Sequence, residues 1–570
     1  MLNDFRSAAH SLAKSPGFAV VAIIILALGI GASTAIFSVV HAVLLKPLGY
    51  QDAAQLVQIQ SQHPEQGLSA IAPATFDNLR RESRSFAAIT AQQYYYVNLT
   101  RTSSPTRLTA IEASADYFQV FAQRPLLGRT WNPEETRAGA MPVVVLGADL
   151  WRTQFNSRRD IIGETIMLDD VAHTVIGVMP ASFTDPWGNG ALWRPLMLNG
   201  PAMKERAARY LSAYARLRPN VTLEQARAEL AALGGRLAQD YPQDYRGWSL
   251  TATDLQANVV SDYRTGLLVV LGGVGCVLLI TCANVAGLCI VRSLARRKEL
   301  AVRAALGASG SQLLRQMLTE SLVLAALGGG LGVLLANWGV AAIVASLGDS
   351  WIPRASEIAI NGPVLAATLG LTIATGLAFG LGPAWSASRT DANDALKDTA
   401  GRGSAGPAAR RIRSGLVITE IALALMLLVG AGLLGRSFAG LITKKPGLRT
   451  DQVLTLGLSL PDKRYDTVDK RRAFYLAVEE AVAALPGVAA TGFTQTMPFT
   501  WGIPNTLVPV GPSQVSENNP PRAFYDSVGT GFFKAAGIPL IAGRIFSTVD
   551  DQQSPQTVII SQATARRFFG

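Results

Sequence analysis

The residue types that most often do metal, redox or nucleophilic chemistry are few in this sequence and far apart. Three cysteines, Cys276, Cys282 and Cys289, lie in one apolar run without a Cys-x-x-Cys pair, which argues against a disulfide framework and a structural zinc site. The four histidines show no ligand spacing of the H-E-x-x-H kind, and the sequence has no Gly-Lys dipeptide and therefore no P-loop. An enzyme with its own active site is the least favoured class of function.

One run of charged residues has a spacing that could contact another protein. Glu299 and Arg303 are four positions apart, on one face of a helix that Gly307 would end. The connection around them has one acid and six basic residues, which are Arg292, Arg296, Arg297, Lys298, Arg303 and Arg315. On spacing alone, a basic helix that faces lipid headgroups is favoured over a protein contact.

Composition indicates the environment of these residues. The chain has 570 residues and 51 Lys+Arg against 40 Asp+Glu, so its formal net charge is +11. Only 16% of the residues are charged and 49% are hydrophobic, whereas typical soluble domains have about 25% charged residues. These values exclude a disordered chain and argue against one ordinary soluble domain. The largest basic runs flank apolar segments, so we expect a lipid bilayer as partner and no nucleic acid.

Five apolar runs are long enough to cross a bilayer, which takes about 20 residues as a helix. The first four have no charged residue, and the fifth has only Glu420. We expect transmembrane helices at residues 18–45, 266–291, 321–347, 363–388 and 416–434. Two alternatives stay open. The first run could be a cleaved signal peptide, although it exceeds the usual core of about 7–15 residues, and the fifth could be a buried core helix.

Basic residues indicate the orientation, because cytoplasmic loops carry an excess of Lys and Arg. The basic segments expected on the cytoplasmic side are the amphipathic N-terminus 1–17, the connection 292–320 and the linker 389–413. Residues 46–262 and 445–570 then form two extracytoplasmic domains, with Lys444 and Lys445 as a small violation of the rule. The chain is expected to be a multi-pass membrane protein with a cytoplasmic N-terminus.

The first outer domain has ordinary soluble composition and is predicted to be mixed α/β. The first predicted elements are a strand at Leu56–Gln60 and a helix at Pro73–Phe86. A strand at Val143–Leu146 leads into a helix through Phe155, and a hairpin at Thr165–Met179 turns at Asp169-Asp170. The last helix is capped by Thr222 and Gln225 and runs to Gln239. Within the spans, Gly328-x-x-x-Gly332 and Gly376-x-x-x-Gly380 predict close helix packing.

The sequence also resembles itself. Residues Phe118–Trp131 match Phe533–Phe546 without a gap at an offset of 415, and Lys46-Pro47 matches Lys445-Pro446 after the first and fifth spans. A unit of one span, an outer domain and three spans therefore repeats. The second copy stops after its first span and part of its outer domain, so we expect the 570 residues to be an N-terminal fragment of a longer protein.

At several points the sequence resembles the MacB/FtsX-type ABC transporter permeases, in particular their duplicated (ADOP-like) subgroup. The most specific stretch runs from Glu299 to Ala308, E-x-x-x-R-x-A-L-G-A, between the second and third spans. The similarity covers essentially the whole chain. Further similar stretches are Ser15–Phe18, Leu26–Ala32, Ala35–Ser38, Leu381–Ala384, Ala395–Lys397 and Leu427–Leu433.

The resemblance implies a fold and a mechanism. Four helices and an extracytoplasmic domain would pair with a second copy, and an ABC ATPase would dock from the cytoplasm of a bacterial cell. The stretch between spans two and three would be the coupling segment that enters a groove on this ATPase. Its expected contact positions are Arg297, Glu299, Arg303, Leu306, Gly307 and Ala308.

The chain departs from the MacB pattern, since no ATPase domain precedes the first span, so we expect a separate ATPase subunit to bind ATP. The chain itself is expected to hold no cofactor or metal and to be a transport permease rather than an enzyme.

Three functions stay open at this stage. The first is an export or extraction permease for a hydrophobic, peptide or lipoprotein substrate, which could work with a periplasmic adaptor protein. The second is an FtsX-like regulator or scaffold that controls an extracytoplasmic hydrolase. The third is a membrane sensor or adhesin unrelated to ATP.

Overall fold

A computed structural model gives the fold. It describes residues 2–100, 105–188, 190–198, 200–296, 309–351, 354–388, 407–444, 447–461, 463–499, 503–506, 522–547, 549–551 and 554–569. Contacts divide the chain into two compact units. The first comprises Met1–Tyr95, Thr109–Thr165 and His173–Gly435, and the second comprises Tyr96–Leu108, Ile166–Ala172 and Arg436–Gly570.

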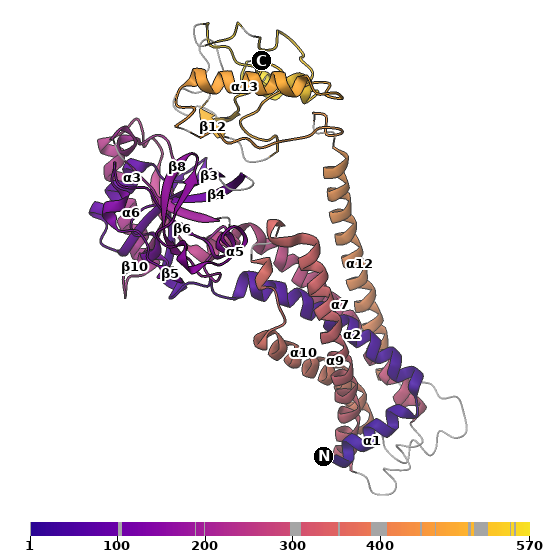
Figure 1. Ribbon diagram of the computed structural model, residues 1–570. Coiled ribbons are helices and arrows are strands. Elements are labelled where there is room, and N and C mark those ends of the chain that lie inside the picture. Colours follow the sequence, from indigo (N-terminus) through magenta and orange to yellow (C-terminus); the bar gives the residue numbers. More distant parts are fainter. Residues whose placement is uncertain are drawn as a thin grey trace. The chain divides into compact units, whose positions relative to one another are not determined.

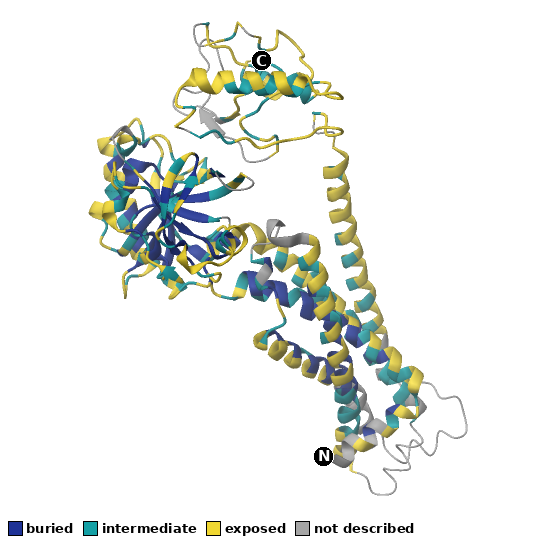
Figure 2. Ribbon diagram, viewed as in Figure 1, coloured by how far each residue is buried: buried dark blue, intermediate teal, exposed yellow. Residues whose placement is uncertain are grey.

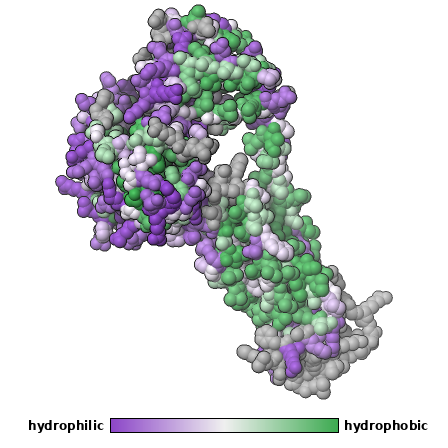
Figure 3. Space-filling model, viewed as in Figure 1, coloured by the Kyte–Doolittle hydropathy of each residue, from purple (hydrophilic) through white to green (hydrophobic). Residues whose placement is uncertain are grey.

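Five helices of the described chain are long and apolar enough to cross a membrane. They are α2 (Pro16–Val40) with its π-helical end η1 (His41–Leu45), α7 (Leu255–Ala295), α9 (Gly310–Trp351), α10 (Gly362–Ser388) and α12 (Pro407–Thr443), after the short N-terminal helix α1 (Leu2–Ala13). Each run predicted to be a span lies within one of them (Figure 1). Apolar residues cover the visible surface over these helices, whereas the surface over the sheet is mostly hydrophilic (Figure 3).

The fifth run lies in α12, which the described part of the chain does not bury. The apolar window of α12 is 0% buried inside the structure, and the helix is exposed along its length in Figure 2. An exposed apolar surface of this length is suited to a bilayer.

Small residues allow the first helices to pack closely, as their spacing predicted. A Cβ atom placed on Gly328 of α9 would lie 2.6 Å from the Leu26 Cβ of α2, and one on Gly332 would lie 3.1 Å from the Ala27 carbonyl oxygen. A Cβ atom on Gly380 of α10 would lie 2.9 Å from the Ser321 Cβ of α9. Glycine is required at these positions because a larger side chain would push the helix backbones apart.

The outer domain is built on one mixed sheet, whose strands belong to the first unit except for residues 96–100, 106–108, 166–168 and 171–172. Its spatial order is β11-β1-β10-β3-β4-β9-β6-β8-β5, with β2 beside β1 and with β7 beside β3 and β8. The strands are β1 (Leu56–His63), β2 (Gly67–Ser69), β3 (Phe86–Thr100), β4 (Thr106–Ala113), β5 (Leu127–Gly128), β6 (Val143–Leu146), β7 (Thr165–Leu168), β8 (Val171–Val178), β9 (Leu192–Pro195), β10 (Ser212–Leu217) and β11 (Ser249–Asp254). Most pairs are antiparallel, but β4–β9 and β6–β8 are parallel.

Helices join this sheet and complete its core. They are α3 (Pro73–Glu82), α4 (Tyr117–Val120), α5 (Ala148–Phe155), α6 (Leu223–Asp240) and the short turns η2 (Ala53–Gln55), η3 (Pro133–Thr136), η4 (Arg159–Ile161) and η5 (Gly200–Lys204). One buried cluster contains Leu79 and Leu230 from α3 and α6, and the other is aromatic and contains Phe118, Phe121 and Trp193. Burying each such side chain contributes about 1.5–3 kcal/mol, so the domain has a core without disulfides.

Most predicted elements of this domain form, with one correction at a helix end. Thr222 and Gln225 make the capping box of α6, and Asp169 and Asp170 have φ of 51° and 62°, as a two-residue hairpin turn requires. The helix predicted to reach Phe86 ends instead at Glu82, because Ser83 is extended and Phe86 begins β3.

The second unit contains α13 (Val468–Ala483), α14 (Phe532–Ala535), α15 (Gln562–Phe568) and the two-stranded sheet of β12 (Ile503–Thr506) and β13 (Arg522–Tyr525). Residues 558–560, which align with β6, form no strand. In the first domain β6 is held between β8 and β9. In the described part of the second unit no such strands flank residues 558–560.

The repeated motif nevertheless folds in the same way twice. Arg129 makes two hydrogen bonds to Glu135, at 2.8 and 2.7 Å, and Arg544 makes two to Asp550, at 2.7 Å each. Each carboxylate also accepts from the backbone amide three residues before it, at 2.8 Å in both cases. All these partners differ by 415 positions, which is what an internal duplication predicts.

Candidate functional site

All six residues predicted to contact an ATPase fall outside the described residues. These are Arg297, Glu299, Arg303, Leu306, Gly307 and Ala308, and their proposed role stays a prediction. The chain is described up to Arg296 and again from Ser309. The end of the bundle where residues 297–308 connect α7 to α9 is termed the coupling end, and the end where α2 and α7 join the sheet is termed the domain end.

A basic cluster lies at the coupling end, directly before the undescribed connection. The Arg292 side chain of α7 donates to the Ser11 carbonyl oxygen of α1 at 2.8 Å, and its guanidinium lies 4.5 Å from the ring centre of Phe18. Arg296, one turn later, donates to the Ser11 hydroxyl at 2.9 Å and pairs with Glu320 of α9 at 3.2 Å. The cluster therefore joins α1, α7 and α9.

The ion pair in this cluster is partly shielded from solvent. The Arg296 and Glu320 side chains are 25% and 13% exposed. Removing one partner of such a pair leaves the other charge poorly solvated, which costs more than the loss of an open surface pair. These contacts hold the end of α7 at Arg296.

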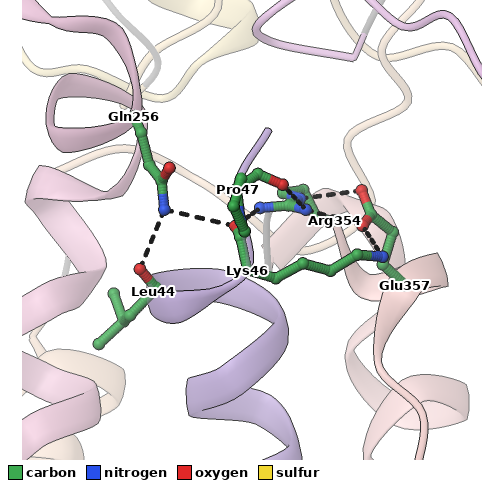
Figure 4. Close-up of polar contacts among 6 residues, drawn as sticks. All are labelled: Leu44, Lys46, Pro47, Gln256, Arg354 and Glu357. Atoms are coloured by element: carbon green, nitrogen blue, oxygen red, sulfur yellow. Dashed lines mark hydrogen bonds and ion pairs between the residues drawn. The ribbon is translucent and has the colours of Figure 1, made fainter. Parts of the chain in front are cut away.

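A second polar network lies at the domain end (Figure 4). Lys46, at the end of η1, pairs with Glu357 of the short turn η6 (Ala355–Glu357) at 2.6 Å. Arg354 pairs with the same carboxylate through two nitrogens, at 2.8 and 2.7 Å. The carboxylate thus joins the end of the first span to the connection between α9 and α10, a separation of 311 positions.

Backbone groups complete this network. The Arg354 guanidinium donates to the carbonyl oxygens of Lys46 and Pro47, at 2.8 and 3.0 Å. Gln256, at the start of α7, donates to the carbonyl oxygens of Leu44 and Lys46, at 3.1 and 3.3 Å. These carbonyl groups lie where the helix of the first span ends and would otherwise need water. Three segments are therefore held together at one point, which we term the domain-end junction (Figure 4).

The electrostatics of the domain-end junction favour an ionised Glu357. Burial alone would raise the pKa of its carboxyl, but the hydrogen bonds from Arg354 and Lys46 outweigh this, so the pKa lies below its usual value. Arg354 itself is left-handed, with φ of 61°. This conformation costs a non-glycine residue about 1–2 kcal/mol, and the four contacts of its guanidinium stabilise it.

One helix connects the two ends. Helix α7 begins directly after β11 and continues for 41 residues to Ala295, which at 1.5 Å per residue is about 60 Å. Strand β11 pairs with β1, the first strand after α2, with Val57 opposite Asp254. Both helices that enter the sheet therefore lead into one antiparallel strand pair.

Sequence analysis missed the domain-end junction. Lys46 was noted only for its place in the repeat, and Arg354 and Glu357 were not singled out. The available signal was the pair of opposite charges three positions apart in a connection between two apolar runs. Nothing in the sequence indicated that Lys46 would be their partner.

Two family models match the chain. Residues 19–233 match the MacB-like periplasmic core domain, and residues 271–392 match the FtsX-like permease C-terminal domain. The first match covers α2 and most of the sheet domain. The second covers the helices around the coupling segment.

Curated relatives are similar over the same region. The Macrolide export ATP-binding/permease protein MacB of Azoarcus sp. (strain BH72) is 29% identical over 397 residues, which are 68% of this chain and 56% of that protein. The protein of the same name from Salmonella paratyphi A is 27% identical over 295 residues, 50% of this chain and 42% of that one. The chain thus spans about half the length of the curated relatives it matches.

Solved structures are similar to part of the chain. The periplasmic region of MacB from Actinobacillus actinomycetemcomitans has 14% sequence identity and a TM-score of 0.29, over 38% of this chain and 94% of that one. The extracellular domain of the noncanonic ABC-type transporter YknZ from Gram-positive bacteria has 9% identity and a TM-score of 0.26, over 35% and 99%.

Proposed function

This chain is a permease of the MacB/FtsX type, and we propose that it is the membrane-spanning subunit of an ABC transporter that couples ATP hydrolysis by a separate ATPase to movements of its outer domain. The observation that supports this best is the continuous helix α7. It joins the sheet directly at β11, and it ends one residue before Arg296 and the predicted coupling segment.

The proposed mechanism is mechanical. Closure of the ATPase around ATP displaces residues 297–308 and with them the coupling end of α7. Because α7 follows β11 without a break, the displacement reaches the sheet. The domain-end junction makes α2 and the α9–α10 connection move together with α7. The chain contributes no cofactor in this scheme, since ATP is bound by the partner.

The location and the substrate are part of the same proposal. The positive-inside rule puts the N-terminus and residues 297–308 in the bacterial cytoplasm and the sheet domain outside the inner membrane. A hydrophobic, peptide or lipoprotein substrate would be exported or extracted by movements of the outer domain, with or without a periplasmic adaptor. The duplicated motif supports a second permease unit in the same polypeptide, of which residues 445–570 form a part.

Charge reversal tests the coupling segment. We expect Arg303→Glu to weaken binding of the cognate ABC ATPase about tenfold or more, since a central charged contact is replaced by a repulsive one. Arg264→Glu is the matched control: it makes the same change on an exposed residue at the domain end of α7. Pull-down of the ATPase and its ATP turnover with both variants in nanodiscs give the answer.

Two outcomes contradict the proposal. In one, Arg303→Glu and Arg264→Glu have the same effect on ATPase binding. In the other, the full chain co-purifies with a cell-wall hydrolase and no ATPase, which would favour the regulatory alternative.

A further inference from the structure

A hollow at the coupling end has a lining unlike the rest of the bundle. It lies between α2, α7, α9 and α10 and has an empty volume of about 550 Å³, counting its opening to solvent. Its charged lining consists of Arg292, Arg296 and Glu320. Its apolar lining includes Phe18, Met317 and Leu324. The lining is thus amphipathic, and its charged part consists of two arginines and one glutamate.

The position of the hollow along the helices is the second observation. Phe18 lies in the first turn of α2, four residues after Lys14, and Arg292 directly follows the charge-free run of α7. Glu320 directly precedes the charge-free run of α9. Three of the four helices thus change from apolar to polar at the level of the hollow. In a bilayer this level is the headgroup region, with acyl chains on one side and water on the other.

We propose that this hollow binds an anionic phospholipid, with its phosphodiester at Arg292 and Arg296 and an acyl chain along Phe18 and Met317. Guanidinium groups recognise phosphate oxygens with paired, charge-assisted hydrogen bonds. Basic pockets between transmembrane helices on the cytoplasmic side bind anionic headgroups for this reason. A zwitterionic lipid would add a cation beside the two arginines and lose this preference.

Glu320 determines how the headgroup sits. Its carboxylate pairs with Arg296 at 3.2 Å and repels a phosphate. The phosphodiester therefore lies on the Arg292 side of the hollow, where the Phe18 ring faces the guanidinium. Since Arg292 and Arg296 also hold Ser11 of α1, a bound lipid would fix α1, α7 and α9 directly before residue 297.

The test is lipid retention by the purified full chain, measured by native mass spectrometry from detergent. The chain is offered equal amounts of phosphatidylglycerol and phosphatidylcholine. We expect about fivefold more bound phosphatidylglycerol, and loss of this preference in Arg292→Gln. Arg315→Gln is the matched control: it removes one exposed arginine from α9 close to the same end, outside the lining, and is expected to keep the preference.

Two further measurements make the outcome decisive. Arg292→Lys keeps the charge and should retain the preference within about threefold, which separates lost recognition from misfolding. Inorganic phosphate at millimolar concentration should leave the bound lipid in place. Equal retention of the two lipids, equal loss in Arg315→Gln, or displacement of the lipid by inorganic phosphate alone would each overturn the proposal. None of these results depends on an ATPase, so they are separate from the test of the proposed function.

Discussion

The two ends of the helix bundle are built differently. At the domain end, the single carboxylate of Glu357 meets two cations, and Arg354 and Gln256 saturate the carbonyl groups where the first span ends. At the coupling end, two arginines and one acid line a hollow that opens to solvent. The polar groups of the domain-end junction thus bond to one another, whereas the basic lining at the coupling end borders a hollow that could hold a ligand.

In the proposed mechanism, the coupling end receives a movement and the domain end transmits it. A contact that transmits movement must be rigid, and a network in which every polar group has a hydrogen-bond partner provides this rigidity. A receiving end must keep charge available for a partner. The predictions below test this contrast by breaking each end separately.

The largest effect is expected from Glu357→Lys at the domain-end junction. It places a third cation beside Lys46 and Arg354 and removes every hydrogen bond that the carboxylate accepts. We expect coupled transport to fall about tenfold while ATPase binding stays within about twofold, because the coupling end is untouched. Asp262→Lys, on an exposed part of α7 near the same end, is the control. If both variants transport equally well, the junction does not transmit movement.

A smaller effect is expected from Gly328→Ala in the bundle. The new Cβ would lie 2.6 Å from the Leu26 Cβ, so α2 and α9 must separate. Overpacking of this kind costs about 1–3 kcal/mol, which should appear as a lower thermal midpoint in detergent. Gly330→Ala on the exposed side of α9, where a Cβ meets nothing within 4 Å, should be neutral or slightly stabilising. Equal midpoints for the two variants would contradict the packing of α2 on α9.

The smallest effect concerns pH. Because the folded-state pKa of Glu357 lies below its unfolded value of about 4.3, its ionisation stabilises the fold above that value. This contribution disappears as the pH falls through the folded pKa. The thermal midpoint of the wild type should therefore lose more between pH 5 and about pH 3 than that of Glu357→Gln. Identical losses would mean that the carboxylate is not held by Lys46 and Arg354.

The sequence predicted the local features of the fold because their causes are local. The capping box at Thr222, the hairpin turn at Asp169-Asp170 and the close packing at Gly328 follow from residue types and short spacings. The spatial order of the strands does not follow in this way. The parallel neighbours β4 and β9 pair Ile111 with Trp193, more than eighty positions apart, and no short-range pattern encodes that pairing.

The same reasoning applies to the functional residues. The coupling segment could be proposed because Glu299 and Arg303 have a helical spacing and belong to a family motif. The domain-end junction could not, because the outer domain and the two long helices α7 and α9 lie between Lys46 and Glu357 in the sequence. Contacts over such separations depend on tertiary packing and become visible only in the structure.

The central claim is that a displacement at residues 297–308 reaches the outer sheet through α7. Spin labels at position 249 of β11 and position 362 of α10, both exposed, allow the distance between sheet and bundle to be measured by pulsed electron resonance in nanodiscs with the cognate ATPase. The account predicts a shifted distance distribution when a non-hydrolysable ATP analogue is added, and no shift in Arg303→Glu. An unchanged distribution in the wild type, or the same shift in Arg303→Glu, would contradict it.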